Sequence, residues 1–269
     1  MSKTLNANDK ALEFLSQLNK DVDLTHELQT EISPDVFFKR NSVNLLIGKK
    51  GSGKTYNVFR EVLKLKWIEN HRYTKMLYIT NKPYDPTYSR IAPHLPIPVE
   101  KVSYDKAVEK INELSEAKKA IVEIQNNNID KSQLDHTLLD NILGENIEGD
   151  TTNIYHSIVL LDDCGFLFEK RTKQNADLWK LLFENRQPKI TYFLTLQDPK
   201  GIDTSIKEAL DSIWLFGGFT QHKFNYLMRN IPHEANVADV WDVYIKLTKN
   251  QALVFLITET GTEIMVLKC

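Results

Sequence analysis

Apolar residues fall along the chain in short runs, and the segments between several of these runs have helical spacing. The runs predict buried strands at residues 42–47, 75–80, 158–161, 190–196 and 212–216. Helical spacing predicts helices within residues 54–67, 104–124 and 177–185. Strands that alternate with helices predict an α/β domain with a mainly parallel central sheet flanked by helices.

The two ends of the chain differ from this pattern. Leu12, Leu15 and Leu18 are spaced as in a helix within an otherwise polar start, so residues 1–40 are expected to form an N-terminal helical extension to a main domain at 41–269. Within 235–269, residues 240–247 are a helix candidate. Two apolar runs, 253–257 and 264–267, predict a β-hairpin around Thr260 and Gly261.

Charge is unevenly distributed. Residues 99–150 carry twelve acidic residues against six lysines, a net of −6, while the whole 269-residue chain has a net charge of −2. We therefore interpret residues 99–153 as an acidic insertion with a mobile end. The remainder is slightly basic, so the overall charge does not exclude a local basic surface.

Composition excludes several classes of protein. Two cysteines, Cys164 and Cys269, cannot form a disulfide framework, which favours a reduced intracellular protein. The N-terminal residues lack the apolar core of a signal peptide, and no apolar run is long enough to span a membrane.

One glycine-rich motif carries specific chemistry. The sequence Gly48-Lys49-Lys50-Gly51-Ser52-Gly53-Lys54-Thr55 fits the P-loop pattern G-x-x-x-x-G-K-[ST] and lies between a predicted strand and a predicted helix. Its backbone N–H groups and the helix N-terminus would bind phosphates, Lys54 would contact the β- and γ-phosphates, and the Thr55 hydroxyl would ligate Mg²⁺. The alternative is an ordinary turn before a helix. The motif predicts ATP and Mg²⁺ as cofactors.

A pair of acids supplies the second half of such a site. Asp162 and Asp163 follow the apolar run 158–161, as in a Walker B motif. Asp162 would hold Mg²⁺ through water, and Asp163 would orient the attacking water. Without the P-loop, the same pattern is typical of a strand that leaves the core. Cys164 is expected to be a small buried residue.

Two further residues are candidates from position. Gln197 ends the run 190–196 and could sense the γ-phosphate, or it is a polar loop residue. A strand after Walker B favours the ASCE or RecA-like class of P-loop NTPases, in which a strand lies between the P-loop and Walker B strands. Arg186 precedes that run and could act on the nucleotide of a neighbouring subunit, or it is a helix-end arginine.

The order of four segments resembles a known family. The segments are GKKGSGKT, SIVLLDDCG, NRQPKITYFLTLQ and DVYIKLTKNQALVFLI. Together, over residues 40–258, they are similar to the genome-packaging ATPases of nucleocytoplasmic large DNA viruses and virophages, which belong to the FtsK–HerA superclass and include the poxvirus packaging ATPase. The family often has Gly-Arg-His where this chain has Asn185-Arg186-Gln187, so only the arginine carries over.

The resemblance implies a function and its partners. It implies an ATP-driven translocase that packages double-stranded DNA into capsids as a homo-oligomeric ring, a pentamer or a hexamer, beside a capsid or portal-vertex protein. The host cytoplasm or virus factory would be its location, with association with the virion. The resemblance also strengthens a trans role for Arg186.

Basic residues after Walker B are the candidates for gripping DNA. They are Lys170, Arg171 and Lys173, with Lys82 and Arg90 as weaker candidates; the alternative is a solvated basic surface. Contacts of this kind would meet phosphates and show no sequence preference. Two other functions stay open: a helicase or mobilisation-type DNA pump of the same superclass, and a nucleotide-regulated scaffold protein with little turnover.

Overall fold

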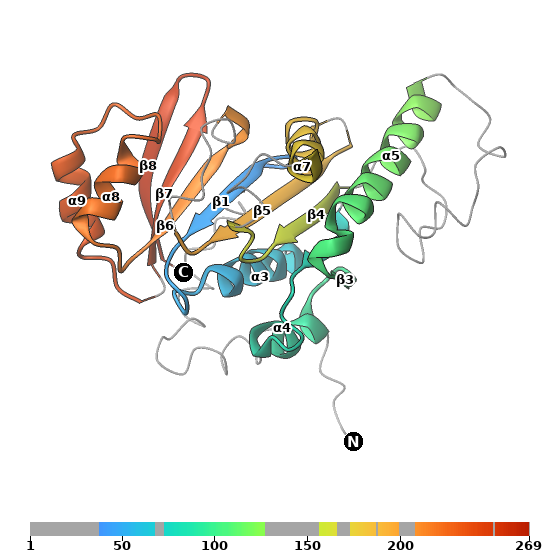
Figure 1. Cartoon of the computed structure of the whole chain (residues 1–269), viewed down its shortest axis with the longest axis horizontal. Helices are drawn as coiled ribbons and strands as arrows, with labels where there is room; N and C mark the ends of the chain where they lie inside the picture. Colours follow the sequence, from blue (N-terminus) through green and yellow to red (C-terminus); the bar gives the residue numbers. More distant parts are fainter. Residues whose placement is uncertain are drawn as a thin grey trace.

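An eight-stranded sheet forms the centre of the molecule, in the order β3-β2-β4-β5-β1-β6-β7-β8 (Figure 1). The computed structural model describes residues 38–67, 73–126, 156–165, 173–186, 188–198, 208–249 and 251–268. The strands are β1 (Val43–Ile47), β2 (Tyr73–Ile79), β3 (Val99–Val102), β4 (His156–Leu161), β5 (Ile190–Leu196), β6 (Ser212–Phe216), β7 (Gln251–Thr258) and β8 (Gly261–Lys268). The first six strands in the sheet order pair in parallel, and β7 and β8 are antiparallel. This confirms the predicted α/β class and the C-terminal hairpin.

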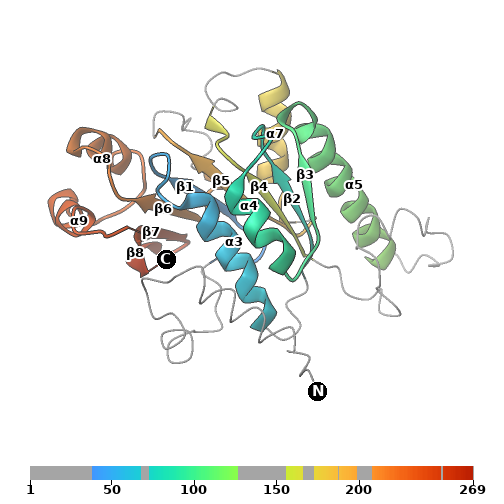
Figure 2. The same cartoon turned by 90° about the horizontal axis from the view of Figure 1, so that it is seen from below.

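Helices cover both faces of the sheet (Figures 1 and 2). One face is covered by α3 and α4, and the other by α5 and α7, with α8 and α9 at the end of the sheet near β6 and β7. The helices are α3 (Lys54–Lys64), α4 (Pro86–Ile91), α5 (Ala107–Asn126), α7 (Lys173–Phe183), α8 (Gln221–Met228) and α9 (Val237–Tyr244), with single 3₁₀ turns η1 (Leu65–Trp67), η2 (Ala92–His94) and η3 (Tyr104–Lys106).

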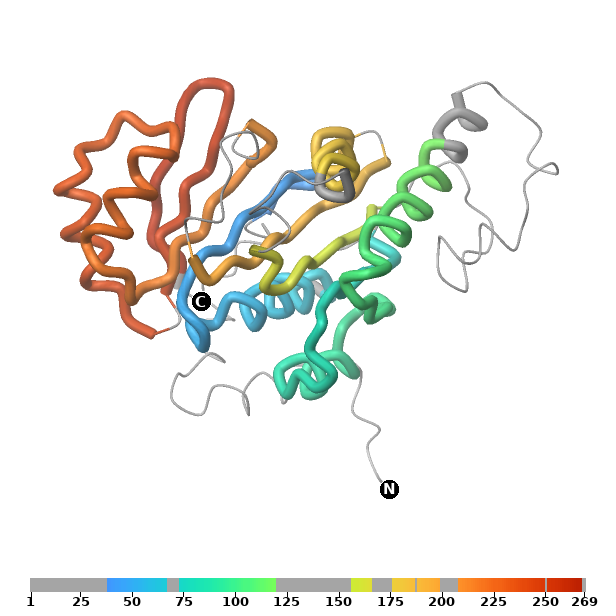
Figure 3. The backbone as a smooth tube through the Cα atoms, viewed as in Figure 1, coloured from blue at the N-terminus to red at the C-terminus, as the bar shows by residue number. Residues whose placement is uncertain are grey.

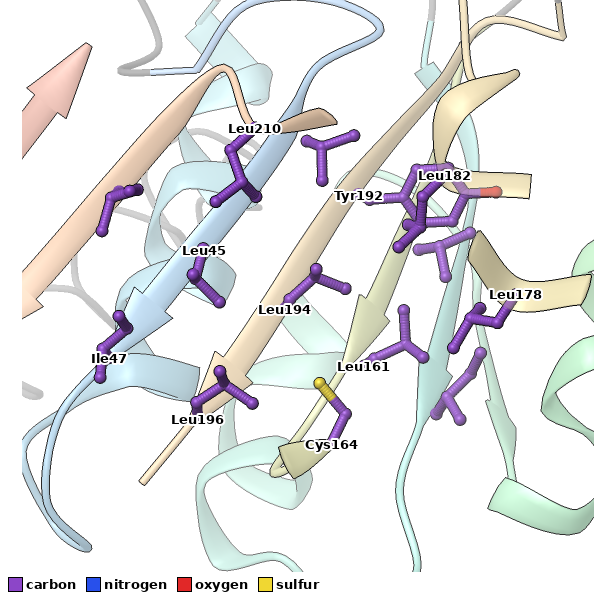
Figure 4. Packing of buried hydrophobic residues seen from close by; sticks show 14 of the residues in the cluster. Leu45, Ile47, Leu161, Cys164, Leu178, Leu182, Tyr192, Leu194, Leu196 and Leu210 are labelled. Carbon is purple, nitrogen blue, oxygen red and sulfur yellow. The ribbon is translucent and has the colours of Figure 1, made fainter. Parts of the chain in front are cut away.

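Alternate residues of each central strand enter two separate cores. In β1, Leu45 and Ile47 pack on the side of α5, α7 and α8, whereas Leu46 packs on the side of α3. Figure 4 shows the first of these cores, where residues of β1, β4 and β5 lie beside Leu178 and Leu182 of α7. Because both faces are covered, the central strands are continuous apolar runs, and this is the pattern that made them visible in the sequence.

The segment that begins at residue 99 differs from the sequence-based expectation. Val99–Val102 is a strand that pairs in parallel with β2, and α5 contributes buried Ile111 and Leu114 to the main core. Its first part is therefore built into the sheet and core and is not an addition to them. Strand β3 was missed because it is short and only half-buried. Residues 127–155, which include the end that was expected to be mobile, lie outside the described residues, as do residues 1–37 of the expected N-terminal extension.

Two short helices were also missed. Asp85 caps α4 by accepting hydrogen bonds from the backbone N–H groups of Thr87 and Tyr88, at 2.9 and 3.2 Å. Helix α8 has eight residues, too few for its periodicity to stand out. Within the described ranges, no helix is both long enough and apolar enough to cross a membrane.

The centre of the sheet should dominate stability. Leu194 in β5 is fully buried, so Leu194→Ala should lower the free energy of unfolding by about 2–5 kcal/mol, through lost burial and the cavity that remains. Val266→Ala on the outer strand β8, where the side chain is 44% exposed, is the matched control and should cost less than about 1 kcal/mol. Urea unfolding measures both, and equal losses would contradict the assigned core.

Candidate functional site

Three predicted site segments leave the sheet at the same edge. Strands β4, β5 and β1 are consecutive neighbours and parallel, with Leu161 opposite Leu194 and Leu196 opposite Ile47. The loops that follow them therefore start side by side, and Figure 3 shows them at one edge. Strand β5 lies between the P-loop strand and the Walker B strand, as the sequence predicted for the ASCE class.

The glycines of residues 48–53 are required by the shape of the loop. Gly51 and Gly53 have φ angles of 79° and 92°, in the left-handed region where side chains are strained. A Cβ on Gly48 would lie 2.5 Å from Ser52 Oγ and 2.8 Å from the Cβ of Phe216, so the loop can approach β6 only without one. The Ser52 N–H donates to the Lys49 carbonyl at 3.2 Å and closes the turn, while Lys50 is exposed. The loop therefore has the shape that the P-loop sequence pattern requires.

Lys54 lies folded into this loop. Its Nζ donates to the carbonyls of Gly48 and Lys49, at 2.6 and 3.0 Å, and the residue is only 7% exposed. Burial lowers the pKa of Lys54 to about 8, although Asp162 and Asp163 favour the charged form. A phosphate at this position would supply the anion that the buried ammonium needs.

Asp162 connects the P-loop to the Walker B strand. The Thr55 hydroxyl donates to Asp162 Oδ1 at 2.5 Å, and the Thr195 hydroxyl donates to the same oxygen at 2.9 Å. The other oxygen accepts from Lys82 Nζ and lies 3.3 Å from the Tyr78 hydroxyl oxygen. Asp162 is 2% exposed, and burying a carboxylate so deeply is costly unless donors of this kind pair with it.

Asp163 has different side-chain partners from its neighbour. Its φ angle is 61°, an unusual value for a residue other than glycine, and its N–H donates to Thr195 Oγ1 at 2.7 Å. Gln197 Nε2 donates to Asp163 Oδ2 at 2.5 Å. The structure thus brings Asp163, the expected base, into direct contact with Gln197, the expected sensor. The unusual backbone conformation also falls on Asp163, the residue expected to act on water.

The residues present fit a phosphate and a magnesium ion. Ser52 Oγ is buried without a hydrogen-bond partner beside the glycine turn, which leaves it available to a phosphate oxygen. Thr55 and Asp162 provide adjacent hard oxygen ligands. The described ranges contain no group of three or more His, Cys, Asp or Glu side chains suited to a metal, so an ion here would depend on these two residues and on the phosphates, as Mg²⁺ commonly does.

The structure places Arg186 away from this edge. Arg186 precedes β5, at the amino ends of the parallel strands, and forms a long ion pair of 3.8 Å with Asp211, which precedes β6. Its side chain is 81% exposed. One strand length, about 20 Å, separates it from the P-loop of the same chain, so it could serve only the site of another subunit. The trans role stays a prediction.

The DNA candidates are divided between described and undescribed residues. Lys170 and Arg171 lie outside the described residues, and Lys173 begins α7. Arg90 is exposed on α4. Lys82 contacts Asp162, so it belongs to the candidate nucleotide site.

Sequence reasoning missed three members of the site. Thr195 lies within a buried apolar run, Tyr78 is a buried strand residue, and Lys82 was considered only for DNA. A polar residue within an otherwise apolar strand was the available signal for Thr195. Cys164 is fully buried, as expected, and burial raises its thiol pKa well above the usual value (Figure 4).

Solved structures share this fold. The DNA-packaging ATPase B204 of Sulfolobus turreted icosahedral virus superposes with a TM-score of 0.55 at 14% identity, over 84% of this chain and 98% of that one. B204 of Sulfolobus turreted icosahedral virus 2, solved with ATP-γ-S, gives 0.51 at 16%, over 87% and 98%. EssC (ATPases 2 and 3) from Geobacillus thermodenitrificans gives 0.52 at 14%, over 83% of this chain and 39% of that one. No protein-family model matches the sequence, and a search of curated proteins gives no match.

The lowered pKa of Lys54 predicts a pH dependence. A bound triphosphate would raise that pKa, so at pH 7 binding needs no added proton, whereas above about pH 8 it must take one up. ATP affinity should fall above pH 8, by at most tenfold per pH unit. Calorimetry in two buffers of different ionisation enthalpy should show that, at pH 9, nearly one proton is taken up for each ATP bound. Lys54→Arg, which stays charged, should bind without that uptake; uptake equal to the wild type would exclude Lys54 as its source.

Proposed function

We propose that this protein is an Mg²⁺-dependent ATPase of the FtsK–HerA kind that uses ATP hydrolysis to move double-stranded DNA, and that the cargo is a viral genome entering a capsid. The observation that carries the ATPase part is the Thr55–Asp162 hydrogen bond, which joins residues 107 positions apart into one metal-side pair. The buried Lys54 and the glycine turn complete the phosphate side.

Each residue has a separate task in this proposal. The loop 48–53 and Lys54 would bind the phosphates. Thr55 would ligate Mg²⁺ and Asp162 would hold it through water, and the charge of the ion would offset that of the phosphates. Asp163 accepts a proton from the attacking water, and Gln197, already bonded to Asp163, keeps its carboxylate in position. Thr195 fixes both acids, because its hydroxyl bonds to the side chain of one and the backbone of the other.

The fold shared with packaging ATPase B204 supports DNA as cargo, as does the sequence resemblance to viral packaging ATPases. The proposal includes a homo-oligomeric ring, a capsid or portal-vertex partner and action in the infected host cell. A helicase or mobilisation pump would use the same site, and a scaffold protein would bind nucleotide with little turnover.

DNA-stimulated hydrolysis tests the function. Wild-type protein should hydrolyse ATP, and double-stranded DNA of unrelated sequences should raise the rate to a similar degree. Lys54→Ala should abolish hydrolysis and weaken binding. Hydrolysis without any DNA response would leave an ATPase with another cargo, and binding without hydrolysis would favour the scaffold protein.

The two acids should separate binding from turnover. Asp163→Asn should bind Mg-ATP nearly as the wild type does and hydrolyse it at least about a hundredfold more slowly, because the base is lost while Asp162 is kept. Asp162→Asn should lose magnesium-dependent affinity as well. Measuring affinity and turnover on the same samples distinguishes the two; an equal loss of both in Asp163→Asn would assign Asp163 to metal binding.

Arg186 should act between subunits. Arg186→Ala should bind nucleotide but hydrolyse it on the order of 10³-fold more slowly in the assembled ring. Rings mixed from Arg186→Ala and Lys54→Ala chains should recover activity where an intact P-loop meets an intact arginine. Arg229→Ala, at another exposed arginine, is the control. Absence of recovery in rings shown to be mixed would make Arg186 a helix-end surface residue.

A further inference from the structure

Lys82 occupies a position that the proposed chemistry does not explain. It lies just beyond the carboxyl end of β2, next to the Walker B strand, and its Nζ donates to Asp162 Oδ2. The ammonium side chain is 46% exposed while its partner is 2% exposed. The ion pair therefore links a half-exposed lysine on a long side chain to the buried carboxylate that is proposed to hold the metal.

The backbone around Lys82 is held by specific contacts. Lys101 Nζ donates to the carbonyls of Lys82 and Pro83, at 2.7 and 3.1 Å. Asn81 Oδ1 accepts from the Tyr104 N–H at 3.0 Å. At the far end of the turn, Asp85 accepts from the Tyr78 hydroxyl at 2.5 Å. These hydrogen bonds fix the turn 80–85 against β2, β3 and η3. The backbone of Lys82 is therefore held where its side chain can reach Asp162.

Two different cations thus compete for one carboxylate. Thr55 and Thr195 contact Asp162 Oδ1, and Lys82 contacts Oδ2, so the ammonium already neutralises the charge that a divalent ion would use. An ammonium and Mg²⁺ on the same carboxylate would repel each other strongly at this partly desolvated position. Movement of Lys82 away from Oδ2 would therefore favour a metal beside Thr55 and Asp162.

We propose that Lys82 is an exchangeable counter-ion of Asp162, which blocks the metal position until a nucleotide brings its own metal and phosphates. The inference rests on the proposed function for the identity of the metal site. The anionic phosphates would compensate the displaced ammonium, so the exchange is favourable with Mg-nucleotide and unfavourable with Mg²⁺ alone. Lys82 is then a positioning residue that makes metal binding depend on nucleotide.

The test uses divalent metal without nucleotide. Mn²⁺ binding, measured by electron paramagnetic resonance with Mg²⁺ as competitor, should be weak in the wild type and about tenfold or more tighter in Lys82→Met. Lys82→Arg should remain weak, because it keeps the positive charge. Lys110→Met is the control for a lost surface charge; Lys110 pairs with Glu113 on α5 and should bind Mn²⁺ as the wild type does.

Thermal unfolding gives a second readout. In EDTA, Lys82→Met should unfold at a lower temperature than the wild type, because buried Asp162 has lost a partner, and Mg²⁺ should restore much of the difference. In an Asp162→Asn background, Lys82→Met should change neither the affinity for Mn²⁺ nor the shift in unfolding temperature that Mg²⁺ causes. Lys82→Gln replaces Lys82→Met if the latter does not fold.

The outcomes separate this inference from the proposed function. Equal Mn²⁺ affinity in wild type and Lys82→Met, or tighter binding that persists with Asp162→Asn, would overturn the exchange. Failure of every variant to bind or hydrolyse ATP would overturn the ATPase proposal, while the metal titration would still report on Lys82 and Asp162.

Discussion

The buried carboxylate of Asp162 is the constraint around which the site is arranged. A carboxylate with so little exposure needs several donors, and here they come from different parts of the chain: Thr55 at the end of the P-loop, Lys82 just beyond β2, and Thr195 from β5. Those donors converge only if β2, β4, β5 and β1 are adjacent and in register. The sheet order is therefore a requirement of the site as well as of the core.

This arrangement also gives the two neighbouring acids different surroundings. The Asp162 carboxylate is buried among its donors. At Asp163 the backbone is left-handed, and the Asp163 carboxylate accepts a hydrogen bond from the exposed Gln197. The two carboxylates thus have separate hydrogen-bond partners, although they are consecutive, and this fits the separate roles proposed for them. Thr195 holds the two together from the adjacent strand.

The sequence was sufficient for features set by local pattern. The glycine motif, the acid pair and the apolar runs each depend on neighbouring residues, and β5 and β6 have the predicted bounds. Features that depend on strand order or register could not be predicted from the sequence. Lys82 lies 80 positions from Asp162, and nothing near Lys82 distinguishes it from a surface lysine. Strand β3 is half-buried and four residues long, so its short pattern carried little signal.

A structure of the protein with Mg²⁺ and a non-hydrolysable ATP analogue tests the central claim most directly. The account predicts phosphates within the turn 48–53, a metal beside Thr55 and Asp162, and a Lys82 ammonium that has left Asp162. Phosphates bound elsewhere, or a Thr55–Asp162 pair that stays closed with no metal beside it, would contradict it.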